Sequence, residues 1–500
     1  MGVRLGIGEF HRDGGRGVAP PGDEVPEEEE DEDLPVDLDH ALVPGEVLVR
    51  ARQPQREPPH PLAHRRRLPF PRALVHAPTV GSGTDTGIRP APPSVPRRRR
   101  VSRNDREHGR EYDVVLFGAT GFTGGLTAEY LAAHAPDGCR WALAGRNRDK
   151  LLRLRERLAE TDPSCADLPL VHADADDPAS LRAVAESTRV VATTVGPYIR
   201  HGEPLVAACA EAGTDYVDLA GEPEFVDLMY LRHHERARET GARLVHSCGF
   251  DSVPHDLGVL YTVEHLPEGV PLRIDGYVRA SGTISGGTLA SVLTVASRQR
   301  QTGAVARERR RVEPRPAGRR ISTPSDLPRR SAKAGAWAVP LPTLDPQVVA
   351  RSAAALERYG PDFRYRHYAA VRRLPVAVGG IAVAGAFLAL GLVPAARRAL
   401  SARLAPGEGP SPERRAKSWF AVRFFGEGGG RRVITEVSGG DPGYGETAKM
   451  LAESALCLAL DELPETSGQV TTAVAMGDAL IERLSRAGIG FRVVAVPGRG

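Results

Sequence analysis

The chain has 500 residues and 41% of them are hydrophobic, so it is long enough to form two or more domains, each with its own core. Its 66 basic and 63 acidic residues leave a net charge of +3, which excludes the strongly basic balance of a nucleic-acid-binding protein. The five cysteines form no CxxC pair and no signal-peptide segment opens the chain, so we expect a cytoplasmic protein without a disulfide framework.

Residues 1–110 differ from the rest of the chain. An acidic block, "DEVPEEEEDEDLPVDLD", precedes Pro- and Arg-rich sequence that ends in "PPSVPRRRRVSRNDREHGREYD". Apolar periodicity is nearly absent, so the segment cannot bury enough surface to offset its ordering entropy, and we predict a disordered extension. Two alternatives stay open. The arginines form an arm that touches nucleic acid or anionic lipid, or translation begins at Val101.

Over 111–266, short apolar runs alternate with helical segments, which is typical of a parallel sheet with crossover helices. The pattern predicts strands near 112–117, 140–144, 168–172, 189–194, 215–219 and 242–246. It predicts helices over 122–135, 147–160, 178–187, 201–213 and 223–240. We therefore expect an α/β, doubly wound Rossmann domain.

The pattern changes beyond residue 266, and we expect a second, α+β domain over 267–444. Alternation predicts a strand over 273–282, helical spacing predicts a helix over 288–301, and the basic, Pro-rich stretch 307–346 carries no clear element. Residues 419–440 read as two strands joined by a glycine turn. Helices near 445–462 and 470–487 and a short strand, "FRVVAVP", close the chain, and we expect 445–500 to pack back on the core.

The stretch "DVVLFGATGFTGG", residues 113–125, places a glycine-rich loop between the first strand and the first helix. Such a loop holds a dinucleotide pyrophosphate on backbone amides at the positive end of the helix, and its GxxGxxG spacing is typical of NADP-binding domains. The alternative is a plain strand-to-helix turn. The predicted cofactor-binding residues of this loop are Gly118, Thr120, Gly121, Phe122, Thr123 and Gly124.

The end of the second strand selects between NAD and NADP. An NAD site carries an acidic residue there, whereas this chain has "LAGRNRDKL", in which Arg146 can hold a 2′-phosphate with its planar guanidinium. Asn147 and Lys150 join it as predicted cofactor-binding residues, and the predicted cofactor is NADP. The alternative is that these residues only decorate the start of a helix.

Two later loops complete the predicted site by their chain order. Asp174, in "HADADD", is placed to meet the adenine amino group, and the Gly196–Pro197 turn is placed beneath the nicotinamide ribose. No tyrosine has a lysine four residues later, so the short-chain dehydrogenase pair is missing. We expect no metal, because His233 and His234 are adjacent on a helix and no cysteine has ligand spacing.

The chain resembles the saccharopine dehydrogenase-like oxidoreductases, and within them the trans-acting enoyl reductases. The resemblance rests on "VVLFGATGFTG", "WALAGRNRDKL", "VVATTVGPY", "YVDLAGE", "SCGFDSVPHDLG" and "VSGGDPGYGETAKMLAESAL", in that order from about Tyr112 onward. It implies an NADP-binding Rossmann domain and a second domain that supplies the substrate pocket. For the bacterial branch it implies reduction of a carbon–carbon double bond in an acyl chain carried by a polyketide synthase, for lipid or glycolipid synthesis.

The motif "SCGFDSVPHDLG" (247–258) follows the sixth strand, at the sheet edge where ligands bind in open α/β folds. We expect Asp251 or His255 to position substrate or to relay a proton there, and we add Tyr198 as a third catalytic candidate. The alternative is a turn in which Asp251 or Ser252 caps the next helix and Cys248 is buried filler.

Residues 374–396 carry no charge over 23 positions and have two arginines on each side. A single membrane crossing would separate parts of one fold, so the open alternatives are peripheral contact with a lipid surface, at the inner face of the plasma membrane, and a buried core helix or acyl-tunnel wall. Two functions follow. The first is an NADPH-dependent enoyl reductase, and the second is a catalytically silent lipid-surface protein that keeps the NADP-binding fold.

Overall fold

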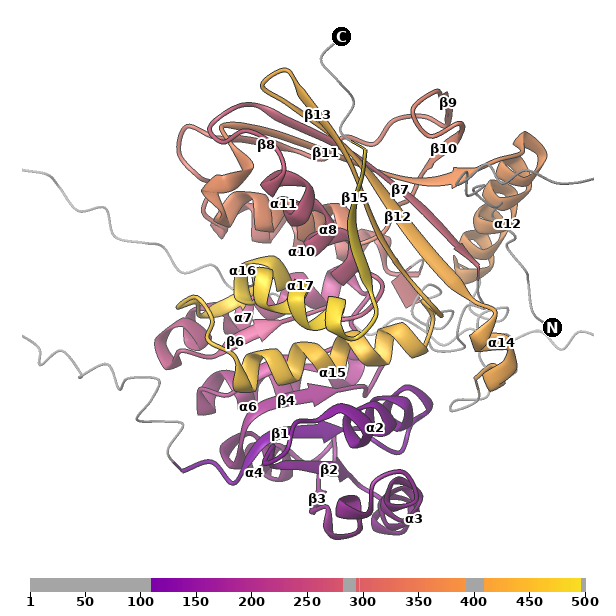
Figure 1. Cartoon of the computed structure of the whole chain (residues 1–500). Helices are drawn as coiled ribbons and strands as arrows, with labels where there is room; N and C mark the ends of the chain where they lie inside the picture. The colour runs from indigo at the N-terminus through magenta and orange to yellow at the C-terminus, as the bar shows by residue number, and fades with distance from the viewer. Residues whose placement is uncertain (1–108, 282–293, 296, 393–408, 496–500) are drawn as a thin grey trace, which may run out of the picture. The chain divides into compact units, whose positions relative to one another are not determined.

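Two β-sheets, here named sheet A and sheet B, organise the computed structural model (Figure 1). The structure describes residues 109–281, 294–295, 297–392 and 409–495. The extension predicted over 1–110 therefore lies almost wholly outside the described residues.

Sheet A is parallel throughout, in the order β3-β2-β1-β4-β5-β6-β14. Without β14, this is the 3-2-1-4-5-6 order of a doubly wound dinucleotide-binding fold, so the Rossmann prediction is confirmed. The central strand β1 is buried at every position, as expected for an apolar run covered on both faces. The strands are β1 (Tyr112–Phe117), β2 (Trp141–Gly145), β3 (Leu170–His172), β4 (Thr188–Thr193), β5 (Asp215–Val217), β6 (Arg243–Val245) and β14 (Gly468–Val470).

The helices between these strands follow the predicted ranges closely. Asn147 and Asp177 cap α3 and α4 with their side chains, which explains why those helices begin where they do. The helices are α2 (Phe122–His134), α3 (Arg148–Ala159), α4 (Pro178–Ser187), α5 (Tyr198–His201), α6 (Glu203–Ala212), α7 (Pro223–Thr240) and α8 (Val253–Glu264), with a 3₁₀ turn, η1, at Pro163–Asp167.

Sheet B is mixed, in the order β15-β13-β12-β7-β11-β10-β9, with β8 paired to β11. The β7–β11 and β8–β11 pairs are parallel and the others antiparallel. The predicted 419–440 hairpin is present as β12 and β13, which turn at Gly429 and Gly430, both with positive φ. The strands are β7 (Leu272–Ser281), β8 (Arg320–Ser322), β9 (Arg329–Ser331), β10 (Ala336–Pro340), β11 (Asp362–Val371), β12 (Trp419–Gly428), β13 (Arg431–Gly439) and β15 (Gly490–Ala495).

The helix predicted over 288–301 is confirmed where the structure describes it, since residues 294, 295, 297 and 299–301 are helical and α10 (Gln299–Val312) extends beyond the predicted end. The basic, Pro-rich stretch 307–346, for which no element was predicted, contains β8, β9, β10 and the start of α11 (Asp345–Ala355). Charge rather than an apolar stripe holds α10. Its buried Arg309 contacts Asp227 of α7 at 3.1 Å and lies 4.0 Å from the Tyr230 ring centroid. The rest of 288–301 falls partly outside the described residues.

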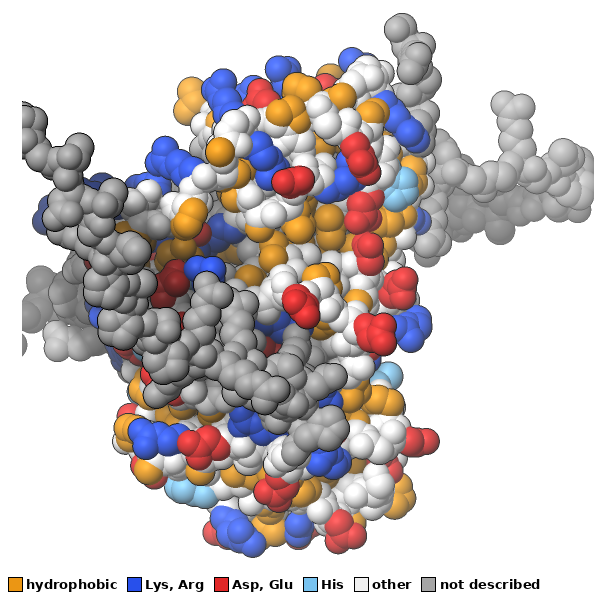
Figure 2. All heavy atoms as spheres, turned by 90° about the vertical axis from the view of Figure 1, so that its left-hand side faces the viewer, with side chains coloured by type: hydrophobic (Ala, Val, Ile, Leu, Met, Phe, Trp, Pro, Cys, Tyr) orange, Lys and Arg blue, Asp and Glu red, His pale blue; other side chains and the backbone are white. Residues whose placement is uncertain are grey.

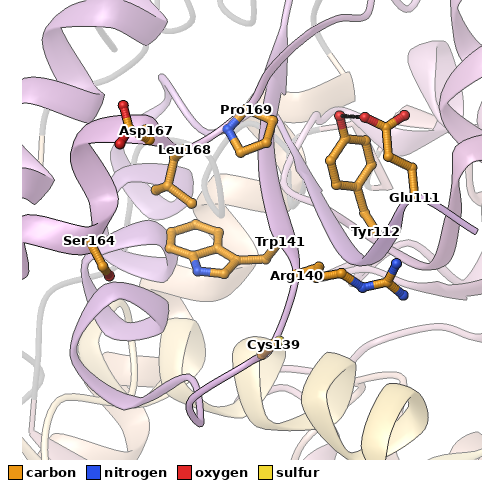
Figure 3. Close-up of a pocket in the computed structure, with 9 residues that line it drawn as sticks. All are labelled: Glu111, Tyr112, Cys139, Arg140, Trp141, Ser164, Asp167, Leu168 and Pro169. Carbon is orange, nitrogen blue, oxygen red and sulfur yellow. Dashed lines mark hydrogen bonds between the residues drawn. The ribbon is translucent and has the colours of Figure 1, made fainter.

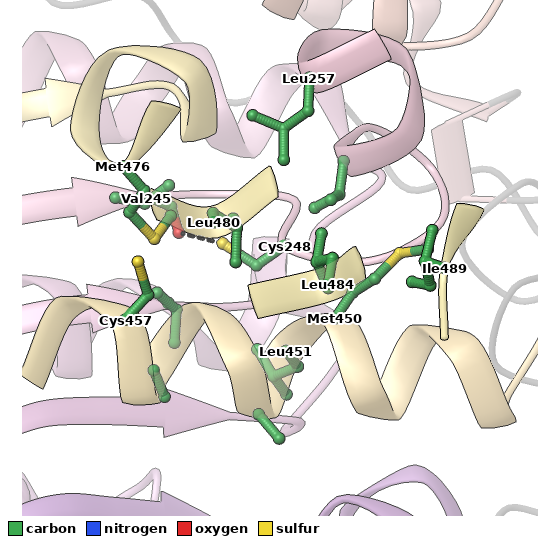
Figure 4. Packing of buried hydrophobic residues seen from close by; sticks show 14 of the residues in the cluster. Val245, Cys248, Leu257, Met450, Leu451, Cys457, Met476, Leu480, Leu484 and Ile489 are labelled. Atoms are coloured by element: carbon green, nitrogen blue, oxygen red, sulfur yellow. Dashed lines mark hydrogen bonds between the residues drawn. The ribbon is translucent and has the colours of Figure 1, made fainter. Parts of the chain in front are cut away.

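The C-terminal segment joins both sheets. Helix α15 (Gly445–Leu460) packs against α2, β1 and β4, so the end of the chain lies beside its first described elements (Figure 1). The helix predicted over 470–487 is two helices, α16 (Thr472–Ala475) and α17 (Gly477–Arg486). Met450, Cys457 and Leu480 from these helices meet Val245 and Cys248 in the main hydrophobic core (Figure 4).

The apolar run 374–396 forms helix α12 (Leu374–Leu392). Residues 393–396 of the run lie outside the described residues. Ala377 is buried, whereas apolar side chains around it are exposed, with Leu374 at 46%, Val378 at 56% and Ile381 at 44%. Among the residues that the structure describes, no helix meets the length and hydropathy needed to cross a membrane. Figure 2 shows the side of the molecule that lies at the left in Figure 1, and this side carries charged side chains of both signs.

Candidate active site

The glycine loop has the geometry that a dinucleotide pyrophosphate needs. Gly118 has φ +87°, and a Cβ there would lie 2.7 Å from Val195 Cγ2. A Cβ on Gly124 would lie 2.1 Å from the Gly118 carbonyl oxygen, so only glycine lets α2 approach β1 this closely. Gly121 is the N-cap of α2 and no side chain occupies the cap, which leaves the first helical amides for a ligand. The loop therefore fits a bound diphosphate.

Phe122, the first residue of α2, is held from the second half of the chain. Its ring meets Tyr444 edge-on at 4.9 Å between centroids, and the Arg415 guanidinium, from α14 (Pro412–Ala416), lies 5.9 Å from it. Tyr444 belongs to the "DPGYGETAKM" motif, in which Asp441 accepts a hydrogen bond from Gly445 N at 3.1 Å. That motif is thus brought to the glycine loop.

The residues predicted for the adenosine side lie in loops at the ends of β2 and β3. Arg146 directly follows β2 and is exposed, so its guanidinium is accessible to a 2′-phosphate. Lys150 is also exposed, while Asn147 accepts a hydrogen bond from Lys150 N at 2.9 Å and caps α3. Asp174 accepts from Asp176 N at 3.2 Å and is half-buried. Their contacts with cofactor stay predictions.

The Gly196–Pro197 turn, whose peptide bond is cis, follows β4 and is anchored by Glu222. The buried Glu222 carboxylate accepts from Tyr198 N at 3.3 Å and from Ile199 N at 2.8 Å. Tyr198 donates to Thr193 O at 3.1 Å and accepts from Leu219 N at 3.1 Å, and burial raises the pKa of its hydroxyl well above the ordinary value. These contacts hold Tyr198 in the loop, and its place among the catalytic candidates stays a prediction.

Asp218, which follows β5, ties two neighbouring loops together. Its buried carboxylate accepts from Ala220 N at 2.9 Å and Ser247 N at 2.8 Å, and contacts His246 Nδ1 at 2.7 Å. Ser247 has φ +64°, a conformation that costs a non-glycine residue about 1 kcal/mol or more. Asp218 and Glu222 were not among the predicted site residues, although both lie in the "YVDLAGE" motif, residues 216–222.

Asp251 lies in this fixed loop and is exposed. Desolvation by the surrounding protein raises the pKa of the Asp251 carboxyl group to about 6, and the negative charge of Asp345 adds to the shift. A Cβ on Gly221 would lie 3.3 Å from Asp251 Oδ2, so the loop after β5 lies against this carboxyl group. Asp251 stays a candidate for proton transfer, and its catalytic role is a prediction.

The capping alternative is confirmed in its position, because Ser252 is the N-cap of α8, although the Ser252 side chain makes no cap hydrogen bond. Cys248 is fully buried in the core, as the packing alternative expects. Asp256 is structural, because it accepts from Ser352 Oγ at 2.5 Å and Thr472 Oγ1 at 2.7 Å.

His255 is buried and lies away from solvent, between α8 and sheet B. Its Nε2 lies 3.7 Å from Asp345 Oδ1, and His367 Nε2 lies 3.4 Å from Asp345 Oδ2. Burial lowers the pKa of His255 to about 4, with the Asp345 charge opposing the shift, so the imidazole is neutral at pH 7. Three separate segments supply this cluster, so residue spacing could not have revealed it.

A pocket of about 370 Å³ lies at the opposite edge of sheet A (Figure 3). Tyr112 and Trp141, the first residues of β1 and β2, line it, with Arg140 and Pro169. Ligands of open α/β folds bind at the carboxyl ends of the strands, whereas these residues lie at the amino ends. This pocket is therefore separate from the candidate active site.

Residues 114–245 match the family of the saccharopine dehydrogenase NADP-binding domain. A Mycobacterium tuberculosis protein, provisionally named a trans-acting enoyl reductase, is 41% identical over 415 residues, covering 77% of this chain and 97% of its own. The trans-acting enoyl reductase of Mycobacterium leprae is 37% identical over 410 residues, with 76% and 97% covered. Apo saccharopine dehydrogenase from Saccharomyces cerevisiae aligns with a TM-score of 0.46 and 13% identity, over 76% of this chain and 99% of that one.

The fold and the glycine-loop site define an NADP-dependent oxidoreductase, and NADP as the cofactor is confirmed. The chain belongs to the trans-acting enoyl reductase family of saccharopine dehydrogenase-like proteins. The catalytically silent alternative finds no support among these relatives.

Proposed function

We propose that this enzyme reduces the α,β double bond of an acyl thioester with NADPH. The glycine loop carries the proposal, because Gly118 and Gly124 let α2 pack closely on β1 and no side chain caps the first amides of α2. Relatives at 37–41% identity named as trans-acting enoyl reductases support the reaction class. We assign cofactor binding to 111–266 and the substrate pocket to 267–444, with 445–500 packed on both.

The side chains have separate tasks in this reaction. When bound, NADPH would supply the hydride for the β-carbon, and the thioester carbonyl would take up the double-bond electrons before the α-carbon is protonated. Protonated Asp251 donates a proton to the α-carbon. The product is the saturated thioester. Glu222 and Asp218 hold the loops at the nicotinamide side in place. Arg146, Asn147, Lys150 and Asp174 hold the adenosine half.

The acyl substrate in this proposal is carried by a polyketide synthase, and its product enters lipid or glycolipid synthesis. The word trans-acting in the relatives' names supports a reductase that works on a chain held by another protein. Contacts between carrier and reductase would be the same in the ground state and the transition state, so a matched carrier should lower KM far more than it changes the chemical step.

NADPH oxidation with a panel of enoyl thioesters tests the proposal. Each chain is offered as its coenzyme A thioester and on an acyl carrier domain, with the saturated thioester as a matched control. We expect turnover only with the unsaturated forms, and a lower KM on the carrier. Tight NADPH binding without turnover on any member would favour the silent alternative instead.

We also propose that α12 touches an anionic lipid surface from the cytoplasmic side. Exposed Leu374, Val378 and Ile381 supply apolar contact, and exposed Arg372 and Arg373 lie at the helix start, where headgroup phosphates would meet them. Flotation with vesicles of phosphatidylglycerol tests this. We expect binding by the parent and loss in the Val378→Glu/Ile381→Glu variant. Equal binding by both, or none by either, would contradict contact through α12.

A further inference from the structure

We propose that His255, Asp345 and His367 form a binding site for a divalent transition-metal cation of the Zn²⁺ class. The three residues come from α8, from the first position of α11 and from β11. One possible ligand atom from each lies within 4.8 Å of the other two. The site lies away from the glycine loop, and Asp345 is the residue that it shares with the surroundings of Asp251.

The distances suit a small cation. Asp345 Oδ1 lies 3.7 Å from His255 Nε2, and Asp345 Oδ2 lies 3.4 Å from His367 Nε2. Ligand atoms around a tetrahedral Zn²⁺ lie about 3.3 Å apart, since Zn–N and Zn–O bonds are about 2.0–2.2 Å. The two pairs that share Asp345 are thus near ligand spacing, and only the two imidazoles need to move closer.

The polar atoms of the cluster lack the partners that buried groups normally have. All three side chains are at most 3% exposed. Asp345 Oδ1, His367 Nε2 and His255 Nδ1 have no hydrogen-bond partner among the described residues, although the ion-pair distances are short. Asp345 Oδ1 and His367 Nε2 face the proposed cation position, and a cation there would give both atoms the partner that buried polar atoms normally have.

The surroundings orient the ligands as a metal site requires. Tyr365 Oη contacts His367 Nδ1 at 2.9 Å and so fixes the ring with Nε2 toward Asp345. The His255 and His367 rings meet edge-on at 4.8 Å between centroids, and Phe250 covers His255 at 5.7 Å. Two imidazoles and one carboxylate favour Zn²⁺ or Co²⁺ over Mg²⁺ and Ca²⁺, which prefer oxygen ligands.

The three ligands also join elements of different parts of the fold. His255 lies on α8, which leaves the carboxyl edge of sheet A, and His367 lies on a central strand of sheet B. A bound cation would therefore crosslink α8 to β11, and its loss should loosen the packing between them. The metal-free expectation from the sequence rested on spacing alone and is not tested by these observations.

The full-length protein, stripped with a chelator and then titrated with Zn²⁺ or Co²⁺, tests the site. We expect one cation per chain by elemental analysis, the visible spectrum of four-coordinate Co²⁺, and a melting temperature higher by on the order of 3–5 °C with Zn²⁺. Binding of less than about a tenth of an equivalent of cation per chain, with no shift in melting temperature, would overturn the proposal.

Three variants localise the binding. Asp345→Asn and His367→Gln should bind no cation, whereas His172→Gln, an exposed histidine of sheet A, should bind as the parent does. NADPH binding checks that each variant is folded. Cation binding by Asp345→Asn or His367→Gln at the parent's affinity would place the metal elsewhere and refute the site. If those variants fail to fold, the Co²⁺ spectrum of the parent decides alone.

Discussion

The glycine loop after β1 and the 247–252 loop after β6 occupy the same edge of sheet A but are built differently. The first offers backbone amides and lacks side chains where Gly118 and Gly124 approach their neighbours. The second is fixed by buried carboxylates, with Asp218 accepting from Ser247 N at 2.8 Å, and it presents the carboxyl group of Asp251. One loop is shaped to hold a ligand of fixed form, and the other places a side chain that can exchange a proton.

This difference separates the two tasks of the site, which are cofactor binding and proton donation. A cofactor is the same in every turnover, so a backbone cradle suffices for it. A proton donor needs a tuned pKa, which depends on distant residues such as Asp345. Substitutions in the first loop should therefore impair binding, and substitutions in the second should impair kcat.

The largest expected effect is that of Asp251→Asn. If Asp251 donates the proton, kcat should fall by about 10²–10⁴-fold while NADPH affinity stays unchanged. Steady-state kinetics and NADPH fluorescence measure the two quantities. Asp167→Asn, an exposed carboxylate at the opposite edge of the sheet, should leave both unchanged. Unchanged kcat in Asp251→Asn would remove this residue from the reaction.

The pH profile sharpens the same assignment. Because the acid form acts and the pKa is about 6, kcat/KM should be flat at lower pH and fall about tenfold per pH unit above it. The carboxyl group's pKa is above its ordinary 3.8, so its contribution to stability is complete below that pH and is lost as the pH rises through about 6. A kcat/KM that rises between pH 6 and 8 would contradict the role of donor.

Gly124→Ala should disrupt the glycine loop after β1. The new Cβ would lie 2.1 Å from the Gly118 carbonyl oxygen, so α2 must move off β1 and its amides must leave the phosphate position. We expect a loss of about 1–3 kcal/mol in stability and of on the order of 100-fold in NADPH affinity. Gly125→Ala is the matched control, since its Cβ would meet nothing closer than 3.5 Å. Equal affinities in the two variants would refute the cradle.

Much of sheet A could be predicted because its signals are local. Each strand is a buried apolar run, and Gly118 and Gly124 lie next to the strand and helix that they serve. The region between β7 and β11 could not be predicted as well, because α10 lacks an apolar stripe and is held by Arg309 against Asp227, 82 positions away. The same holds for the site. Asp251 was identified from its motif, whereas Asp345 and His367 meet His255 only in the folded chain.

Arg146→Asp should have an intermediate effect on coenzyme preference. Loss of a guanidinium from the 2′-phosphate, and its replacement by a like charge, should weaken NADPH binding by about 10–100-fold and leave NADH binding unchanged. Fluorescence titration with both coenzymes measures this. Arg153→Asp, also exposed and with the same change in charge, is the control. Equal weakening of NADPH binding by both variants would contradict the assignment of Arg146 to the 2′-phosphate.

Cys248→Ala should have the smallest effect. The thiol is fully buried in the main core beside Val245 and Leu480, so its loss should lower the free energy of unfolding by about 1 kcal/mol and leave kcat unchanged (Figure 4). Denaturant unfolding and the kinetic assay check the two expectations. A large loss of kcat at unchanged stability would show chemistry at Cys248 that its burial does not predict.

Calorimetric titration of the purified chain with NADPH and with NADH tests the central claim most directly. We expect one NADPH site per chain, with NADH bound at least about tenfold more weakly because it lacks the 2′-phosphate that we assign to Arg146. Absence of heat with either coenzyme, or equal affinity for both, would contradict it.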